Sequence, residues 1–238
     1  MKVMNTYRLI TTAAVLLAVQ TGTFLYAART VIRTESAVYT VVSDKTADAA
    51  AVERFDSALQ PLAEEVFSRI GVKTPLSFSV TLCFGAWLFK KETGLDEHTP
   101  GIYIPVKRLF VFQNPKALEN RGILQQVLRH ELCHAAIDEW RTRKGIDYSE
   151  QNRWLEESIC AALYPSGDFS AEGGVEKFKE MRGDEKIIKK YIESNIKSSS
   201  YDARRKAYSL AAAFGRNELE KKGLPALLNK LLPGGKIR

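Results

Sequence analysis

The amino-acid sequence predicts an α+β protein, because segments with strand composition come early in the chain and helical segments dominate later. The predicted strands are rich in β-branched and aromatic residues and lie at residues 30–43, 76–83, 102–104 and 109–112. From residue 116 onward, apolar residues recur at the three- and four-residue spacing of amphipathic helices. The sequence contains no internal repeat, so the fold class rests on this separation of strands and helices.

Each element has its own signal in the sequence. Residues 30–43 are typical of one strand, or of two strands joined by a turn, and Thr99-Pro100-Gly101 marks a turn before the two short strands. Helical spacing predicts helices at residues 49–70, 116–144, 152–164, 175–181, 185–196, 203–222 and 224–232. We expect a break in the second of these helices at Gly122 and its end at Gly145. Pro165–Gly174 is predicted to be a loop.

The composition is that of an ordinary globular protein. The chain has 238 residues, of which 45% are hydrophobic and 26% charged, and this excludes a disordered, collagen-like or multi-span membrane protein. The length fits one domain, predicted over residues 28–232, with a flexible tail at 233–238. Three cysteines are too few for a disulfide scaffold. The net charge is +7, but basic and aromatic residues do not interleave as in nucleic-acid-binding modules, so we expect no nucleic-acid partner.

The first 27 residues have the layout of an export signal. Met1–Arg8 is short and basic, Leu9–Ala28 carries no charge, and the small residues Ala27 and Ala28 close the uncharged run. We therefore predict a signal peptide over residues 1–27 and an exported chain, in the periplasm, at the cell surface or secreted. The alternative is an uncleaved membrane anchor, because about 20 uncharged residues can just span a bilayer.

Residues 130–134 read His-Glu-Leu-Cys-His, which is a metal-binding pattern. The chain has only three histidines, and its composition predicts roughly 0.003 occurrences of this pattern by chance. On a helix, His130 and His134 lie one turn apart on the same face, so both imidazoles can bind one Zn²⁺ per chain. Glu131 is offset by about 100° and can reach a water beside the metal. The alternative is a pair of buried core histidines, and His98, in a polar stretch, has no assigned role.

A second motif, Trp154-Leu155-Glu156-Glu157-Ser158, follows. Together the two segments resemble the gluzincin zinc metallopeptidases, above all the peptidase MA-like domains, in which HExxH is followed by W-L-x-E-G-x-A. The resemblance implies that Glu157 is the third zinc ligand, with Glu156 as the alternative. Ser158 and Cys160 stand where that family usually has Gly and Ala. The resemblance also implies a zincin-like fold, in which a small N-terminal mixed or antiparallel sheet precedes an active-site helix and a helical C-terminal part.

The activity implied by the resemblance is that of a zinc-dependent endopeptidase acting on a peptide or protein. Zinc would lower the pKa of a bound water to about 7, and Glu131 would accept its proton as general base and pass it to the leaving amine. By family analogy Tyr208 donates to the oxyanion, with Tyr201 as a weaker candidate; otherwise Tyr208 is an ordinary tyrosine at the edge of the core. Asp138 is either a partner that orients a histidine ring or a solvated acid.

Two further alternatives stay open. Cys133 and Cys160 face the space between the two motif helices, where they either form a disulfide or pack as free thiols, and Cys83 is left over on a strand. The chain is either an active peptidase or a catalytically inactive zincin-fold binding module of the cell envelope, which Ser158 and Cys160 would favour. We expect a monomer, and the positive charge leaves peripheral association with a membrane or the cell envelope open.

Overall fold

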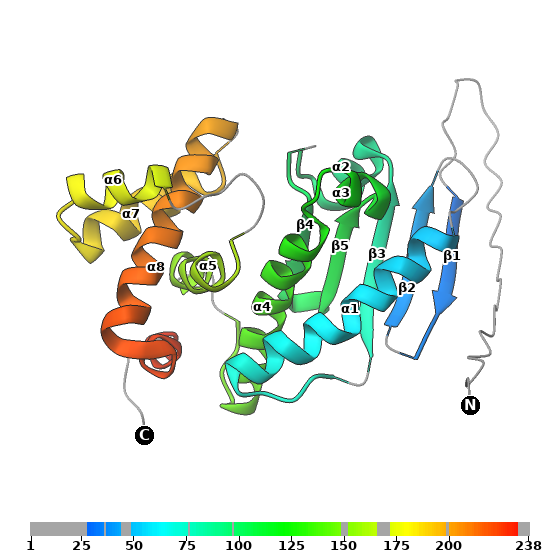
Figure 1. The fold of residues 1–238 in the computed structure, drawn as a ribbon, viewed down its shortest axis with the longest axis horizontal. Coiled ribbons are helices and arrows are strands. Elements are labelled where there is room, and N and C mark those ends of the chain that lie inside the picture. The colour runs from blue at the N-terminus through cyan, green and yellow to red at the C-terminus, as the bar shows by residue number, and fades with distance from the viewer. Residues whose placement is uncertain are drawn as a thin grey trace. The chain divides into compact units, whose positions relative to one another are not determined.

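The five strands of the sheet lie in the first half of the chain with two helices among them, and helices follow, so the predicted α+β class is confirmed (Figure 1). The computed structural model describes residues 28–35, 37–43, 49–75, 77–96, 98–148, 152–165, 172–198 and 200–232. The predicted signal peptide and C-terminal tail lie outside the described residues, and both stay predictions.

The sheet is mixed. Its strands are β1 (Ala28–Arg33), β2 (Ala37–Ser43), β3 (Phe78–Phe84), β4 (Gly101–Ile104) and β5 (Leu109–Gln113), in the spatial order β1-β2-β3-β5-β4. The two outer pairs, β1 with β2 and β4 with β5, are antiparallel, whereas β3 runs parallel to both of its neighbours. Residues 30–43 thus contribute to two strands rather than one, which is one of the two arrangements that the sequence predicted.

The helices follow the predicted order with two differences. They are α1 (Ala49–Ile70), α2 (Ala86–Thr93), α3 (Pro115–Asn120), α4 (Leu124–Arg143), α5 (Arg153–Leu163), α6 (Glu172–Glu180), α7 (Glu185–Asn195) and α8 (Tyr201–Lys230), with a 3₁₀ turn at Pro105–Lys107. The break at Gly122, where φ is +67°, separates α3 from α4. Helix α2 was not predicted, and α6 begins at Glu172, inside the segment predicted to be the Pro165–Gly174 loop. The predicted division at Gly223 is confirmed, because this residue is non-helical (φ +77°) and kinks α8. Within the described ranges, no helix combines the length and apolarity needed to cross a bilayer.

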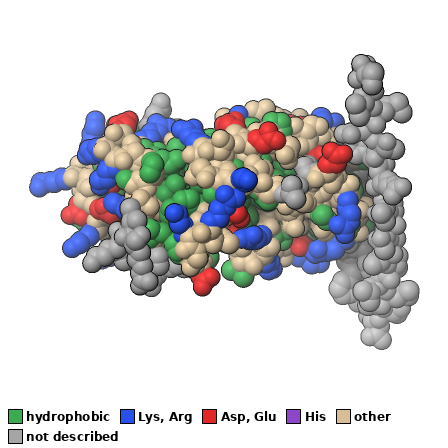
Figure 2. All heavy atoms as spheres, turned by 90° about the horizontal axis from the view of Figure 1, so that it is seen from below, with side chains coloured by type: hydrophobic (Ala, Val, Ile, Leu, Met, Phe, Trp, Pro, Cys, Tyr) green, Lys and Arg blue, Asp and Glu red, His purple; other side chains and the backbone are tan. Residues whose placement is uncertain are grey.

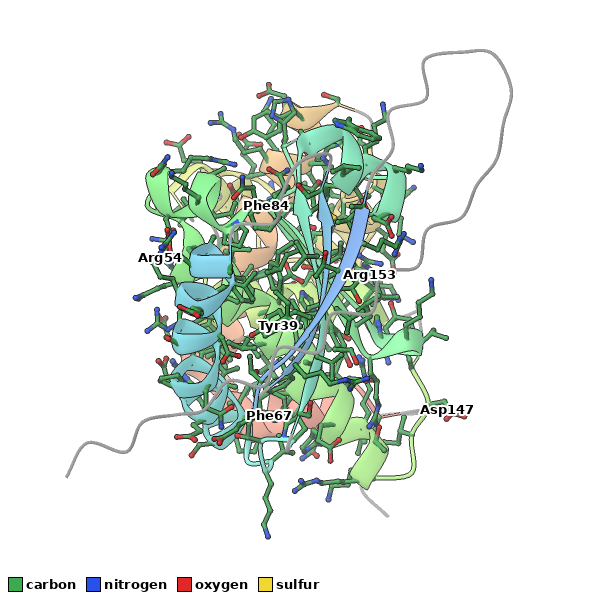
Figure 3. The ribbon with its side chains drawn as sticks, turned by 90° about the vertical axis from the view of Figure 1, so that its right-hand side faces the viewer. Tyr39, Arg54, Phe67, Phe84, Asp147 and Arg153 are labelled. Atoms are coloured by element: carbon green, nitrogen blue, oxygen red, sulfur yellow. The ribbon has the colours of Figure 1, made fainter. Side chains whose placement is uncertain are left out.

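The chain divides into two compact units. The first, which we call the sheet unit, consists of the described residues of Met1–Pro61 and Pro75–Leu124. On one face of its sheet, Phe55 of α1 contacts the rings of Tyr39 and Phe112, with ring centroids 6.0 and 5.2 Å away. Figure 3 shows Tyr39 between the strands and α1, and Arg54 on the outer side of that helix. The opposite face is covered by α2, whose Leu88 and Phe89 pack with three strand residues, Val42, Cys83 and Val111.

The second unit, which we call the helical unit, consists of the described residues of Leu62–Thr74 and Gln125–Arg238. In it α8 packs against α5, α6 and α7. The crossing of α8 over α5 is close because Gly215 has no side chain: a Cβ there would lie 2.0 Å from the Ser158 carbonyl oxygen. Beside this crossing, the rings of Trp154 and Phe214 contact each other with centroids 5.3 Å apart. These contacts fix α5, which carries the second sequence motif.

The side chains on the face of the molecule drawn in Figure 2 mix both signs of charge. Lys and Arg occur there in several separate groups, interspersed with Asp and Glu and with hydrophobic side chains. This face therefore presents a mixed surface rather than one continuous basic field.

Candidate metal centre

The buried charged residues of the protein concentrate on two helices of the helical unit. Among the described residues, all buried His, Asp, Glu and Arg side chains except Glu218 belong to α4 or α5, and they are His130, Glu131, His134, Asp138, Arg141, Glu156 and Glu157. Charged side chains are almost never buried unless they are paired or bind an ion. These helices therefore hold a site whose polar groups need partners inside the protein.

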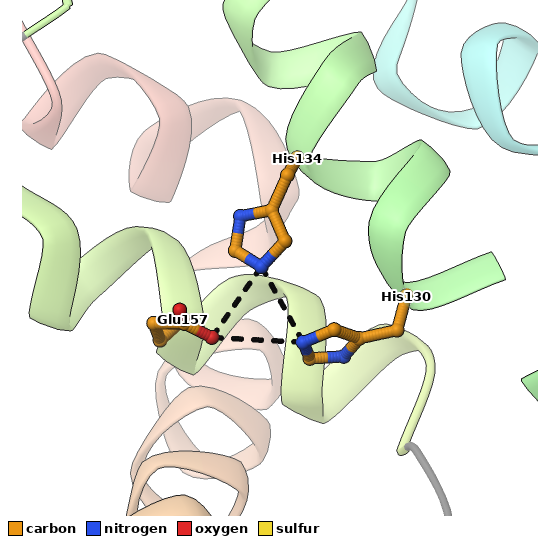
Figure 4. A group of neighbouring side chains, drawn as sticks. All are labelled: His130, His134 and Glu157. Atoms are coloured by element: carbon orange, nitrogen blue, oxygen red, sulfur yellow. Dashed lines mark hydrogen bonds and ion pairs between the residues drawn. The ribbon is translucent and has the colours of Figure 1, made fainter. Parts of the chain in front are cut away.

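Three of these side chains converge on one point (Figure 4). The Nε2 atoms of His130 and His134 lie 3.4 Å apart, and Oε2 of Glu157 lies 3.5 Å from the first and 3.4 Å from the second. The three ligand atoms thus form a nearly equilateral triangle. The i, i+4 spacing on α4 supplies the two imidazoles, and α5 supplies the carboxylate.

The outer nitrogens of both imidazoles are already engaged. Nδ1 of His130 lies 3.1 Å from the carbonyl oxygen of Tyr164, and Nδ1 of His134 lies 2.7 Å from Oε1 of Glu156. A carbonyl and a carboxylate only accept, so each Nδ1 carries a proton and donates it. In the neutral rings the lone pairs of both Nε2 atoms therefore point into the triangle, toward a carboxylate oxygen. Three electron-rich atoms facing one another repel unless a cation lies between them.

The two neighbouring glutamates of α5 are held in different ways. Glu157 turns Oε2 toward the imidazoles, while its Oε1 lies 3.6 Å from Nε of Arg153, one turn earlier on the helix. Glu156 lies between His134 and the buried guanidinium of Arg141, whose Nη1 is 2.5 Å from Oε2 of Glu156. Glu157 is thus the acid that faces the triangle. Glu156, the alternative ligand in the sequence analysis, instead contacts the far side of a histidine.

The charged groups of the site shift one another's pKa values. Burial alone lowers the pKa of His134, but the nearby Glu157 and Glu156 carboxylates outweigh burial and raise this pKa well above its ordinary value. Burial acts in the opposite sense on the acids, yet His134 holds the pKa of Glu157 well below its usual range, with help from His130 and Arg153. His134 and Arg141 likewise lower the pKa of Glu156. Both acids are therefore ionised at neutral pH, and the site attracts a cation.

The geometry and the donor set fit a small divalent metal ion. Ligand atoms at 2.0–2.1 Å from a tetrahedral Zn²⁺ are separated by about 3.3–3.4 Å, close to the sides of the triangle. The buried part of α4 and α5 contains four carboxylates and one guanidinium, so negative groups outnumber positive ones even when His134 is protonated. Glu157 Oε2 is buried and accepts no hydrogen bond within the described part of the chain. His130, His134 and Glu157 could therefore hold a metal ion.

The other residues singled out by the sequence lie at different places. Glu131 and Asp138 are buried on α4, while His98 is exposed in the sheet unit. The half-buried Tyr208 of α8 lies beside His130, with ring centroids 6.5 Å apart. Burial, Glu157 and then Glu131 raise the pKa of the Tyr208 hydroxyl, so it stays protonated and Glu131 lies within electrostatic reach of it. The Tyr164 carbonyl and the Glu156 carboxylate accept hydrogen bonds from the two histidine Nδ1 atoms. They thus fill the ring-orienting role that the sequence suggested for Asp138.

Sequence reasoning missed three groups that position the ligands. These are the backbone carbonyl of Tyr164 and the side chains of Arg141 and Arg153. Arg141 follows His134 by two helical turns and Arg153 precedes Glu157 by one, so helical spacing could have suggested both arginines. Nothing in the sequence indicates the Tyr164 carbonyl, because a backbone contact depends only on how the chain is folded.

Comparison of the chain with models of known protein families and with curated proteins gives no match. The functional interpretation therefore rests on the residues and on their geometry.

Proposed function

We propose that the protein is a zinc-dependent metallopeptidase of gluzincin type. The observation that carries the proposal is the triangle of two imidazole nitrogens and one carboxylate oxygen, with sides of 3.4–3.5 Å. Two histidines and a glutamate are a set of three protein ligands found in catalytic zinc sites, which keep a fourth position open. A structural zinc site would instead have four protein ligands, and the metal-binding group among the described residues has three.

The residues of the site have separate tasks in this proposal. When bound, Zn²⁺ supplies Lewis-acid chemistry, which polarises a carbonyl and makes water acidic near neutral pH. His130, His134 and Glu157 hold it, while Tyr164 and Glu156 fix the two rings by accepting from their Nδ1 atoms. Arg153 keeps Glu157 turned toward the rings.

Glu131 is the proposed general base. It follows His130 on α4 and is buried on the helix that also carries His130, His134 and Arg141 of the site. In this role it accepts a proton from water and passes it to the leaving amine. Tyr208 is the proposed donor to the developing oxyanion, because its hydroxyl stays protonated and its ring lies beside His130.

The residues that depart from the family pattern leave the triangle alone. Ser158 is fully buried, and its hydroxyl donates to the Trp154 carbonyl oxygen at 2.7 Å, within its own helix. Cys160 faces Cys133 rather than the ligands. Neither residue competes for the ligand atoms, so we favour an active peptidase over an inactive binding module.

The setting of the enzyme is part of the proposal. The signal-like segment 1–27 indicates export, and the natural substrate is a peptide or protein. We propose that a monomer acts in the periplasm, at the cell surface or outside the cell.

The test is proteolysis by the zinc-loaded full chain and by Glu131→Gln. We expect the variant to keep zinc and to cleave a denatured protein substrate at least about 100-fold more slowly, because only the proton acceptor is removed. Glu139→Gln is the matched control, since Glu139 lies on the same helix but pairs with Arg143 at the surface. Equal cleavage by Glu131→Gln and the parent would overturn the assignment of the base. Zinc-loaded parent without any activity would favour the binding module.

A further inference from the structure

Two cysteines meet beside the ligand triangle. Cys133 of α4 and Cys160 of α5 are both fully buried, and their Sγ atoms lie 2.6 Å apart. Two sulfurs that merely pack stay farther apart than this, whereas a disulfide bond is about 2.05 Å long. Both sulfurs belong to the helical unit, and a small movement of the side chains brings them to bonding distance.

The thiols have no other task at the site. Among the residues that the structure describes, the group able to hold a metal consists of His130, His134 and Glu157, without a cysteine. The third cysteine, Cys83, is buried on β3 in the sheet unit, among Val42, Leu88 and other apolar side chains. Cys133 and Cys160 are therefore available to each other.

We propose that Cys133 and Cys160 form a disulfide bond that ties α4 to α5 next to the metal ligands. Cys133 directly precedes His134, and Cys160 lies three residues, about one turn, after Glu157. The bond joins the two helices that supply the three ligand atoms, so it keeps the triangle assembled. Its formation does not depend on peptidase activity, but its effect on metal retention rests on the proposed zinc site.

The bond forms by exchange with a small disulfide such as glutathione disulfide. One cysteine thiolate attacks a glutathione sulfur, forms a mixed disulfide and releases one glutathione thiolate. The second cysteine thiolate then attacks the protein sulfur of the mixed disulfide and releases the second glutathione thiolate. Overall, the protein loses two electrons and two protons, and glutathione disulfide becomes two glutathione molecules. Because both sulfurs are inaccessible in the folded chain, exchange takes place before α4 and α5 pack together or when they open locally.

The first test counts thiols. The full chain is unfolded, refolded with zinc and a mixture of glutathione and glutathione disulfide, and then unfolded again in the presence of an alkylating reagent. A second sample skips the first unfolding and the refolding and is alkylated in the same way. We expect one alkylated cysteine before reduction and three after it, with digestion giving a fragment pair joined through Cys133 and Cys160. Three alkylated cysteines in both samples, or a bond that includes Cys83, would overturn the proposal.

The second test measures metal retention. We expect zinc to pass to a chelator such as EDTA roughly 10-fold more slowly from the oxidised chain than from the reduced one, because the bond suppresses opening of α5. Cys83→Ala should keep this difference and Cys160→Ala should abolish it. A bond without zinc binding would contradict the proposed function but not the disulfide. Zinc binding without a bond would contradict the disulfide alone.

Discussion

Adjacent glutamates of α5 act on opposite nitrogens of the same imidazole. Oε2 of Glu157 lies 3.4 Å from Nε2 of His134, and Oε1 of Glu156 lies 2.7 Å from Nδ1 of that ring. A carboxylate on Nδ1 fixes the tautomer and the ring orientation, and it makes the other nitrogen a better ligand. Arg141 in turn holds Glu156, so His134 is oriented by a chain of two buried side chains.

We predict that Glu156→Gln lowers the affinity for zinc by about 10- to 100-fold without removing a ligand. The amide oxygen can still accept from Nδ1, but it carries no charge and leaves the Arg141 guanidinium without its counter-ion. Competition with a chromophoric chelator measures the affinity. Glu139→Gln should match the parent, and an unchanged affinity in Glu156→Gln would mean that this contact does not support His134.

The pH dependence of zinc binding and of metal-free stability should run in opposite directions. Glu157 and Glu156 raise the pKa of His134 above 6.5, so the metal-free protein is stabilised by the protonated ring below that pH and loses this contribution as pH rises through the raised pKa. The lowered pKa values of Glu156 and Glu157 stabilise the metal-free protein above pH 4.5, and this contribution is lost as the pH falls through those lowered values. Zinc needs the deprotonated ring, so its affinity rises with pH.

Zinc titrations and thermal unfolding between about pH 5 and pH 8 check this prediction. Metal-free stability that rises steadily over this range would contradict the assigned charges.

The sequence indicates the ligands of α4 more completely than the ligand of α5. The spacing of His130 and His134 places both on one face of any helix. Glu156 and Glu157 differ by about 100° around their helix, so the rotation of α5 about its axis decides which one meets the imidazoles. That rotation is set by packing against distant residues such as Phe214, which local sequence does not encode.

At the scale of elements, the position of α5 depends on its contact with α8. The Cβ of an alanine at position 215 would lie 2.0 Å from the Ser158 carbonyl oxygen and 2.8 Å from the Ala162 side chain. Because the first of these atoms belongs to a helix backbone, it cannot move aside without moving α5. Glu157 of the candidate metal centre directly precedes Ser158, so a shift here reaches that site.

We predict that Gly215→Ala lowers the free energy of unfolding by about 1–3 kcal/mol and weakens zinc binding. Denaturant unfolding and chelator competition measure the two effects. Gly85→Ala is the matched control, because its Cβ would meet neighbours only at 3.4 Å, an ordinary contact distance. Equal stability of Gly215→Ala and the parent would show that the crossing tolerates a side chain.

Elements with long periodic patterns are the ones that the sequence predicts well. Helix α1 matches its predicted range of 49–70, and the expected break at Gly122 lies between α3 and α4. Helix α2 was missed because its eight residues are too few to establish a period and only Leu88 and Phe89 are buried. The strand order β1-β2-β3-β5-β4 was not predictable, because pairing between distant strands depends on contacts that no local pattern contains.

At the scale of the whole molecule, every residue assigned to the metal centre belongs to the helical unit. A ligand that binds only the folded state stabilises it, by about 2.7 kcal/mol at a free concentration 100 times its Kd. The gain in stability should be largest in the helices that carry the ligand residues, because different parts of a protein open with different free energies.

We therefore predict that zinc removal speeds amide hydrogen exchange in α4 and α5 far more than in β2, β3 and β5. Exchange followed by mass spectrometry, with and without chelator, reports both units in one sample. The His98→Ala variant should respond like the parent, because His98 is exposed in the sheet unit. A uniform change across both units would mean that zinc acts on the fold as a whole.

The zinc content of the purified full chain and of its histidine variants tests the metal centre most directly. We expect about one zinc per chain in the parent and in His98→Ala, and almost none in His134→Ala or Glu157→Ala. A parent that binds no zinc after reconstitution, or ligand variants that keep it, would contradict the account.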